Sequence, residues 1–240
     1  MWRFIVYVSA FVIMVIINYL ANSIPLNGQT TGEISSKVTV LFTPASYVFS
    51  IWGLIYFSLA IWIIRMLPGS RRHLLMYEKA LFPFIFSCLL NVFWIFSWHY
   101  EFFISSVFLM IALLLILIRL YQTVKNANAS FFDLFPFSLY LGWISVATIA
   151  NISFTLEFYD WSGWGLSDVT WTIVMLCVAT ALALIFSKRQ RDVVYPLVFV
   201  WAFVGIGVKN QGIEQGLANT AFVLAAVILI GVGYLLGKKA

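Results

Sequence analysis

The sequence predicts an all-α fold, a polytopic membrane helical bundle, from three observations. Of the 240 residues, 63% are hydrophobic and only 10% are charged, whereas an average soluble chain is about 25% charged. The mean hydropathy is +1.00, and so few charges cannot cover a surface that faces water. The hydrophobic residues also gather in blocks close to the ~20 residues that a helix needs to cross a bilayer. We therefore expect the lipid bilayer to surround most of the chain.

Eight apolar blocks follow one another along the chain, and each is expected to form one membrane-spanning helix. They cover residues 4–21, 47–67, 81–98, 102–121, 134–156, 169–187, 193–208 and 217–236. The block at 193–208 is the shortest. The first block ends at Ala21-Asn22-Ser23, which resembles a signal-peptide cleavage site, but its apolar run exceeds the roughly 7–15 residues of a signal core. We expect this block to be retained as a helix.

The basic residues predict how the helices are oriented in the membrane. If the N-terminus is cytoplasmic, all of the 14 lysines and arginines except Lys37 and Lys209 fall at inner helix ends or in inner loops. Basic residues collect on the cytoplasmic side of membrane proteins, so this alternation fits eight helices with both termini cytoplasmic. The net charge of +5 is then explained by topology, without a nucleic-acid partner. The lack of a transit-like leader favours a bacterial plasma membrane.

The sequence contains no set of residues typical of a catalytic or metal site. The two histidines, His73 and His99, have no Cys, Asp or Glu at ligand spacing around them. Cys88 and Cys177 lie inside apolar stretches and form no Cys-x-x-Cys pair. No acidic or basic residue falls in the middle of a predicted span, which argues against ion-coupled transport. We expect no catalytic residue, no metal and no obligatory cofactor.

Aromatic and amide residues form stripes on three predicted helices, at spacings that share one helix face. The stripes are Phe49, Trp52 and Tyr56; Asn91, Trp94 and Trp98; and Trp143, Ala147 and Asn151. With the predicted orientation, Trp52, Trp94 and Asn151 all lie in the outer half of the membrane. Two interpretations are open. The stripes line a pocket for a large planar ligand, or they are ordinary interfacial tryptophans and amides that bond neighbouring helices.

Two predicted outer loops and the last helix have unusual features. Residues 22–46 form a connection that is too long for a turn. The connection that contains Trp161 and Trp164 fits either an interfacial aromatic belt or a lid over a pocket. On the last helix, Gly233 and Gly237 have the spacing that permits close helix contact, which is compatible with a homodimer.

Three motifs in this sequence resemble those of the tryptophan-rich sensory protein / translocator protein family (TspO/MBR). Residues 41–44 (LFTP), which lead into residues 52–56 (WGLIY), resemble the family's proline-rich entry to its second helix. Residues 90–94 (LNVFW) resemble its third-helix motif. Residues 140–151 (YLGWISVATIAN) resemble its fifth-helix motif and are the most specific of the three. The order of the motifs and their helix placement agree with the family as well.

The resemblance covers residues 1–157 and implies a five-helix transmembrane core, followed by three additional transmembrane helices in residues 158–240. It also implies a ligand cavity among the first, second, third and fifth helices, covered by the loop 22–46. The residues that would line or support this cavity are Trp52, Asn91, Trp94, Trp143, Ala147 and Asn151. Members of the family bind porphyrins such as protoporphyrin IX or haem, and sometimes sterols or hydrophobic drugs. Lys37 and His99 would face the carboxylates of a porphyrin.

We therefore expect an integral membrane protein that binds porphyrin, haem or another planar hydrophobic molecule, as a sensor or carrier. Two alternatives are open: a light-dependent porphyrin-degrading enzyme, or a membrane partner subunit that has no small ligand. A binding role is preferred to an enzymatic one because no acid–base residue in the sequence demands catalysis.

Overall fold

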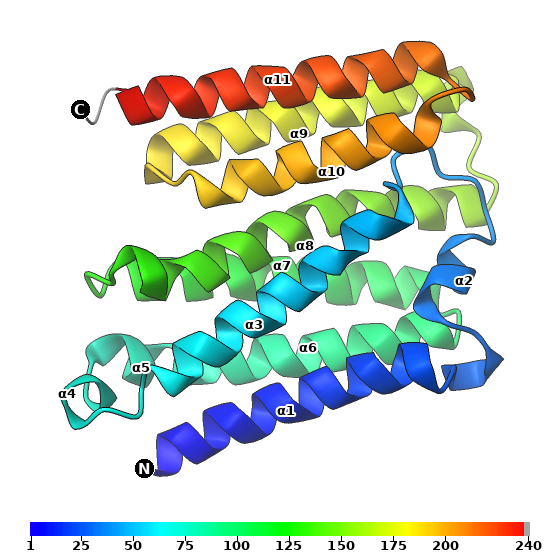
Figure 1. The fold of residues 1–240 in the computed structure, drawn as a ribbon. Helices are drawn as coiled ribbons and strands as arrows, with labels where there is room; N and C mark the ends of the chain where they lie inside the picture. The colour runs from blue at the N-terminus through cyan, green and yellow to red at the C-terminus, as the bar shows by residue number, and fades with distance from the viewer. Residues whose placement is uncertain (238–240) are drawn as a thin grey trace. The chain divides into compact units, whose positions relative to one another are not determined.

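The computed structural model describes residues 1–237, and this part of the chain is all-α, as the composition predicted (Figure 1). Within it, seven helical segments are long and apolar enough to cross a bilayer. The structure therefore confirms the predicted polytopic membrane helical bundle. Lys238 and Lys239, two of the basic residues on which the predicted orientation depends, lie outside the described residues.

The long helices agree with the predicted blocks to within a few residues. They are α1 (Trp2–Ser23), α3 (Ile51–Ile64) with the 3-10 turn η2 (Ser46–Ser50) before it, α6 (Leu81–His99), α7 (Phe103–Lys125), α8 (Phe131–Phe158), α9 (Asp168–Gln190), α10 (Val194–Asn210) and α11 (Gln215–Gly237). The short helices are η1 (Leu26–Gly28), α2 (Thr31–Ser35), α4 (Gly69–Arg72), α5 (Leu75–Lys79) and η3 (Gly163–Gly165). Helix α10 has 17 residues, so the eight predicted spans correspond to seven full-length segments and this shorter apolar helix.

The chain forms two compact units. The first contains residues 1–37 and 52–144, and the second contains residues 38–51 and those from 145 onward. Helix α8 contributes its first half to the first unit and its second half to the second. The division that we predicted after residue 157 rests on the family resemblance and stays a prediction.

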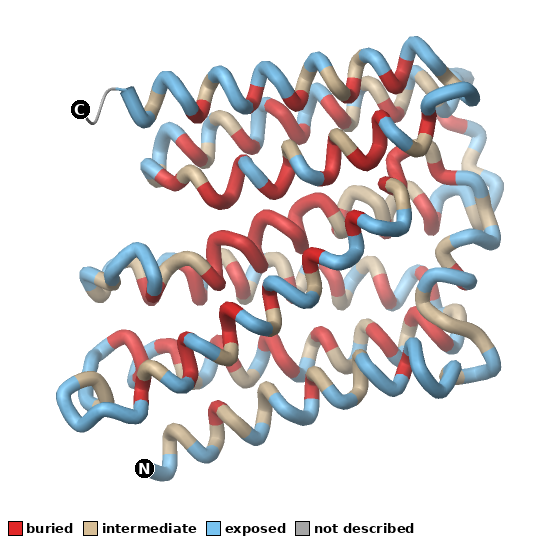
Figure 2. The backbone as a smooth tube through the Cα atoms, in the orientation of Figure 1, coloured by how far each residue is buried: buried red, intermediate tan, exposed pale blue. Residues whose placement is uncertain are grey.

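An aromatic core joins α1, α3, α5 and α6 in the first unit. The ring of Tyr7 meets those of Trp62 and Phe84 edge to face, with centroids 5.3 and 5.0 Å away. A buried hydroxyl needs a hydrogen-bond partner, and the Tyr7 hydroxyl donates to the Tyr77 carbonyl at 2.8 Å. The Tyr77 hydroxyl in turn donates to the Trp62 carbonyl at 3.0 Å. All four side chains are buried, and the buried positions along these helices can be followed in Figure 2.

A charged cluster closes the end of the first unit at which α3 ends and α8 begins. The buried Asp133 carboxylate accepts from the Arg65 guanidinium at 3.2 Å and also from Arg71. The Ser130 hydroxyl donates to its other oxygen at 2.6 Å. These partners compensate the desolvation of the carboxylate, which would otherwise be costly at a buried site. The cluster thereby fixes the α4 turn to the first turn of α8.

In the second unit, α9, α10 and α11 pack together, and residues 40–48 run along α10 as a segment that we call the strap. Two glycines of α10 permit this packing. A Cβ added at Gly207 would lie 2.6 Å from the ring of Phe222 on α11. A Cβ added at Gly205 would overlap the Val48 side chain and lie 3.2 Å from Cβ of Pro44.

Hydrogen bonds fasten the strap to α10. The Ala45 N–H donates to the Gly205 carbonyl at 3.1 Å, the Trp201 indole to the Val48 carbonyl at 3.0 Å, and the Asn210 amide to the Leu41 carbonyl at 3.0 Å. Side chains of α10 thus satisfy backbone carbonyls that a loop would otherwise leave to water. The strap contains the LFTP motif, so α10 has a defined structural role in this unit: it holds that motif in place.

Three tryptophans gather where the connection after α8 meets α9. The Trp161 ring lies 5.4 Å from that of Trp164 and 5.3 Å from that of Trp171, and the Trp171 indole donates to the Gly163 carbonyl at 2.7 Å. The Trp164 side chain is 79% exposed. The choice between an aromatic belt and a lid stays open, and so does the predicted homodimer.

Candidate ligand-binding site

The nine residues of the predicted site are divided between the two units. The first unit holds Trp52, Tyr56, Asn91, Trp94, Trp98 and Trp143, and the second holds Phe49, Ala147 and Asn151. Helical spacing predicts a single helix face for each stripe, but the stripes around residues 49–56 and 143–151 both cross the boundary between the units. The sequence contains no signal for that boundary.

Three of the predicted residues meet in what we call the Trp52 cluster, formed by Trp52 and Tyr56 on α3 and by Tyr140 and Trp143 on α8. The Trp52 and Tyr56 rings are stacked, with centroids 5.5 Å apart and planes inclined by 27°. The Trp52 ring also meets Tyr140 at 5.8 Å and Trp143 at 6.2 Å, in edge contacts. Tyr140 and Trp143 are buried, whereas Trp52 and Tyr56 are partly exposed. The cluster therefore combines a buried base, which contacts the edge of Trp52, with two stacked and partly exposed rings.

A chain of amide hydrogen bonds supports the Trp52 cluster from α1 and α6. The Asn18 amide donates to the Asn91 side-chain oxygen at 2.7 Å, and the Asn91 amide donates to the Tyr140 hydroxyl at 3.1 Å. Asn91 is 1% exposed, so both ends of its side chain are used inside the protein. The role that these contacts give Asn91 is to fix the position of Tyr140.

Trp94 and Trp98 lie one turn apart on α6 and stack on each other, with centroids 5.5 Å apart. The Trp98 indole donates to the Thr31 carbonyl at 3.3 Å, and its ring meets the edge of Phe103 at 5.2 Å. Trp98 is buried and Trp94 is partly exposed. Trp98 therefore anchors α2 of the long loop to the end of α6.

His99 anchors the same loop. The side chain is fully buried, with Nε2 2.9 Å from the Thr31 hydroxyl and Nδ1 3.2 Å from the Leu26 carbonyl. Because a carbonyl only accepts hydrogen bonds, Nδ1 carries the proton of this contact. The Asn27 amide adds a hydrogen bond to the His99 carbonyl at 3.1 Å. Both ring nitrogens are thus committed to the loop.

Lys37, the other cation expected to face a ligand, pairs with Glu101. The hydrogen bond from Lys37 holds the pKa of the Glu101 carboxyl below its usual range, and the Gln29 amide adds to the effect. Glu33 caps α2 by accepting from the Thr30 N–H at 2.6 Å, which lowers its pKa as well. The loop is therefore held by a cap, an ion pair and the His99 contacts.

The three predicted residues of the second unit differ in burial. Phe49 in η2 is 40% exposed, and Asn151 is buried in the second half of α8. The carbonyl of Asn151 accepts from the Thr155 hydroxyl at 2.9 Å. Ala147 is partly exposed, and two residues before it the Ser145 hydroxyl bonds the Tyr195 hydroxyl at 3.0 Å.

Two residues of the site were missed by the sequence predictions. Asn18 is a polar residue within the apolar first block, and this break in the apolar pattern is the sequence signal that could have identified it. Tyr140 lies in the fifth-helix motif, three residues before Trp143, and this shared helix face was its available signal. Its tertiary contacts place it between Asn91 and Trp52. Among residues 1–237, no three His, Cys, Asp or Glu side chains are arranged to hold a metal ion. The chemistry that this site offers is therefore stacking and neutral hydrogen bonding.

Comparison with known proteins identifies the family. Residues 4–234 match the pattern of the family described as TSPO-like protein. The match extends through α9, α10 and nearly all of α11, well beyond the residues 1–157 that carried the resemblance. Neither the curated proteins nor the solved structures contain a match. The motifs, the membrane helices and the match over almost the whole chain lead to one conclusion: the chain belongs to the TSPO-like protein family.

Proposed function

We propose that this integral membrane protein binds a planar hydrophobic molecule of the porphyrin type against the Trp52 cluster. The observation that carries the proposal is the geometry of that cluster, in which the stacked and partly exposed rings of Trp52 and Tyr56 are joined through Trp52 to buried Trp143 and Tyr140. A large flat ligand gains both apolar burial and ring contacts on such a surface. The Asn18–Asn91–Tyr140 chain supports the proposal because it holds the base of the cluster rigid.

The polar groups near the loop favour a metal-free macrocycle over iron ligation. Haem iron is held by an axial side chain, most often a histidine. Both His99 nitrogens already bond the loop, so His99 would have to leave Thr31 and Leu26 to bind iron. Lys37 would likewise have to give up its ion pair with Glu101 before it could pair with a ligand carboxylate. Protoporphyrin IX, bound by its faces, is the ligand that these residues suit better.

The proposed orientation places both termini in the cytoplasm of a bacterial cell. In the first unit, every lysine and arginine except Lys37 lies at the end that carries α4 and α5 (Figure 1). This asymmetry supports an inner location for that end. Labelling of single introduced cysteines in intact cells, in a Cys88→Ala/Cys177→Ala background, tests it. The cysteine of Ser70→Cys should be protected from a membrane-impermeant reagent, whereas that of Ser36→Cys should react.

The binding test is a titration of the detergent-purified full chain with protoporphyrin IX in the dark, followed by porphyrin absorbance and by co-elution. We expect saturable binding at micromolar ligand or below. Trp52→Leu should weaken binding about fivefold, because a ring pair contributes on the order of 1 kcal/mol beyond burial. The matched control is Trp164→Leu, which removes an exposed tryptophan of the second unit.

Linear uptake without saturation, or equal weakening by the two variants, would contradict the proposal. Repeating the titration under illumination separates binding from the light-dependent enzyme, because only the enzyme converts bound porphyrin to a product with a new absorbance. Co-purification of another membrane protein, without saturable porphyrin binding, would favour the partner-subunit alternative.

A further inference from the structure

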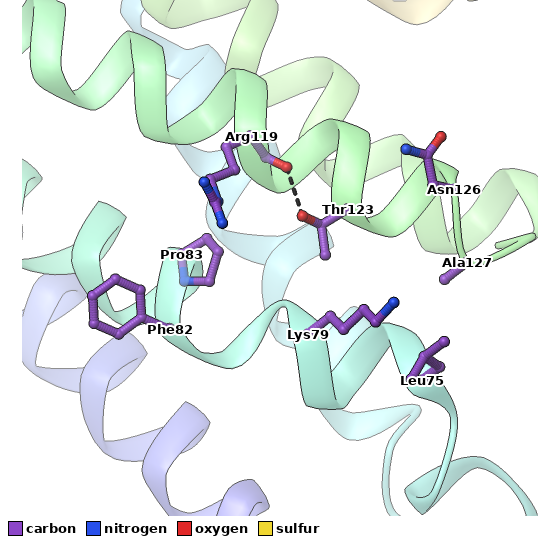
Figure 3. Close-up of a pocket in the computed structure, with 8 residues that line it drawn as sticks. All are labelled: Leu75, Lys79, Phe82, Pro83, Arg119, Thr123, Asn126 and Ala127. Carbon is purple, nitrogen blue, oxygen red and sulfur yellow. Dashed lines mark hydrogen bonds between the residues drawn. The ribbon is translucent and has the colours of Figure 1, made fainter.

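A cavity of about 380 Å³ lies in the first unit between α5, the start of α6 and the end of α7 (Figure 3). It is lined by Leu75, Lys79, Phe82, Pro83, Arg119, Thr123, Asn126 and Ala127. Its volume falls within the roughly 300–1,000 Å³ of small-molecule sites. Trp98 and His99 lie at the other end of α6, so this cavity is separate from the loop contacts and independent of the proposed function.

The polar lining of the cavity is cationic. Lys79 and Arg119 project from opposite walls (Figure 3), and none of the eight lining residues carries a carboxylate. Within the described chain, neither cation has an acidic partner within 4.0 Å, whereas Arg3, Arg65 and Arg71 at the same end are all paired. The Thr123 hydroxyl donates to the Arg119 carbonyl at 2.8 Å, which leaves the Asn126 amide as the neutral donor of the lining. The charge of this lining is complementary to an anion.

Exposed apolar side chains continue from the cavity along both helices. On α6, Phe86 lies one turn beyond Phe82, and their exposed rings are 5.1 Å apart. On α7, Leu115 lies one turn before Arg119, and Leu115 is 61% exposed. Positions four residues apart share a helix face, so these side chains extend the walls of the cavity toward the middle of each span. A soluble anion would gain nothing from these surfaces, whereas acyl chains would be covered by them.

We infer that this cavity binds an anionic phospholipid, with the headgroup phosphate between Lys79 and Arg119 and the acyl chains along the exposed faces of α6 and α7. Basic pockets at the ends of transmembrane helices are suited to anionic headgroups. Each Lys or Arg near an anionic membrane surface adds its own share to the binding free energy. The position of the cavity at the end of two spans places its cations at the depth of lipid phosphates.

The test uses native mass spectrometry of the full chain in detergent, with phosphatidylglycerol and phosphatidylcholine of identical acyl chains. The wild type should bind phosphatidylglycerol more tightly. The double variant Lys79→Gln/Arg119→Gln should bind it about 25-fold more weakly, from about fivefold per charge.

The matched control Arg72→Gln/Lys125→Gln removes two charges from the same end outside the cavity and should change the affinity less than about twofold. The variant Lys79→Arg/Arg119→Lys keeps both charges and should retain most of the preference for phosphatidylglycerol. It shows whether substitution at these two positions by itself disturbs the fold.

Three results would overturn the inference. Equal affinity of the wild type for the two lipids would remove the case for an anionic ligand. An equal loss in the control pair would show that diffuse charge, and not this cavity, attracts the lipid. Complete displacement of phosphatidylglycerol by millimolar inorganic phosphate, with no contribution from the acyl chains, would assign the cavity to a free phosphate compound instead.

Discussion

The Nε2 atom of His99 lies 2.9 Å from the hydroxyl of Thr31, and this contact ties the short helix α2 to the end of α6. Trp98, the residue before His99, bonds the carbonyl of the same threonine. Two adjacent side chains of a membrane helix thus hold one residue of the long loop. Residues 22–37 of this loop are part of the packed structure of the first unit, since Ile34 is also fully buried.

Thr31→Val should destabilise the protein by about 1–3 kcal/mol, the cost of leaving a buried polar group without its partner. The substitution keeps the shape of the side chain and removes the hydroxyl that faces His99. Thermal unfolding in detergent measures the effect, and hydrogen exchange of residues 26–35 should show faster opening there. Thr220→Val is the control, because that hydroxyl bonds the Gly216 carbonyl of its own helix. Equal shifts for the two variants would mean that the His99 contact contributes nothing specific.

The loop should loosen in acid. The pKa of Glu101 is lowered in the folded protein by Lys37, so the ion pair stabilises the fold above the carboxyl's ordinary pKa, and this stabilisation is lost as the pH falls through the lowered value. Protection of the loop from proteolysis should therefore decrease below about pH 4.5, the ordinary value for this carboxyl.

Glu101→Gln should weaken that protection at neutral pH and flatten its pH dependence. Glu33, whose pKa is also lowered, titrates in the same range, so Glu33→Gln is needed as a separate comparison. If the pH profile of Glu101→Gln matches that of the wild type, the Lys37 pair is not what holds the loop.

Asn91→Leu should lower the free energy of unfolding by about 1–3 kcal/mol, because the Asn18 amide and the Tyr140 hydroxyl would each lose a partner. The replacement has a similar size, so packing changes little. Chemical unfolding in detergent checks this. The control is Asn22→Leu, at an exposed position of α1 one turn beyond Asn18. It should have little effect, and a comparable loss there would contradict a specific role for Asn91.

Gly205→Ala should destabilise the second unit by about 1–3 kcal/mol, because the added methyl group meets Val48 and Pro44 of the strap. Gly216→Ala, on α11, meets no atom within 4 Å and should be neutral or slightly stabilising, since alanine is the better helix former. The readout is the thermal unfolding midpoint of each variant. If both glycines tolerate alanine equally, the strap is not packed tightly on α10.

Much of the fold was decided by the sequence itself. The eight apolar blocks predicted the helices to within a few residues, because a helix that crosses a membrane must be long and continuously apolar to be stable in lipid. The same reasoning identified residues 193–208 as the shortest block. The corresponding helix, α10, has 17 residues and is shorter than the seven full-length spans. The three motifs gave the family, which the match over residues 4–234 confirms.

Only the tertiary structure decided what the polar groups of the candidate site do. Periodicity places Asn91 and Trp98 on a common face, but it does not say that Asn91 bonds Tyr140 while Trp98 bonds Thr31. Lys37 and His99 were expected to face a ligand, and both are instead committed to the loop. The reason is physical: helical spacing is a local property, whereas the partner of a buried hydrogen-bonding group is set by whichever distant segment packs against it.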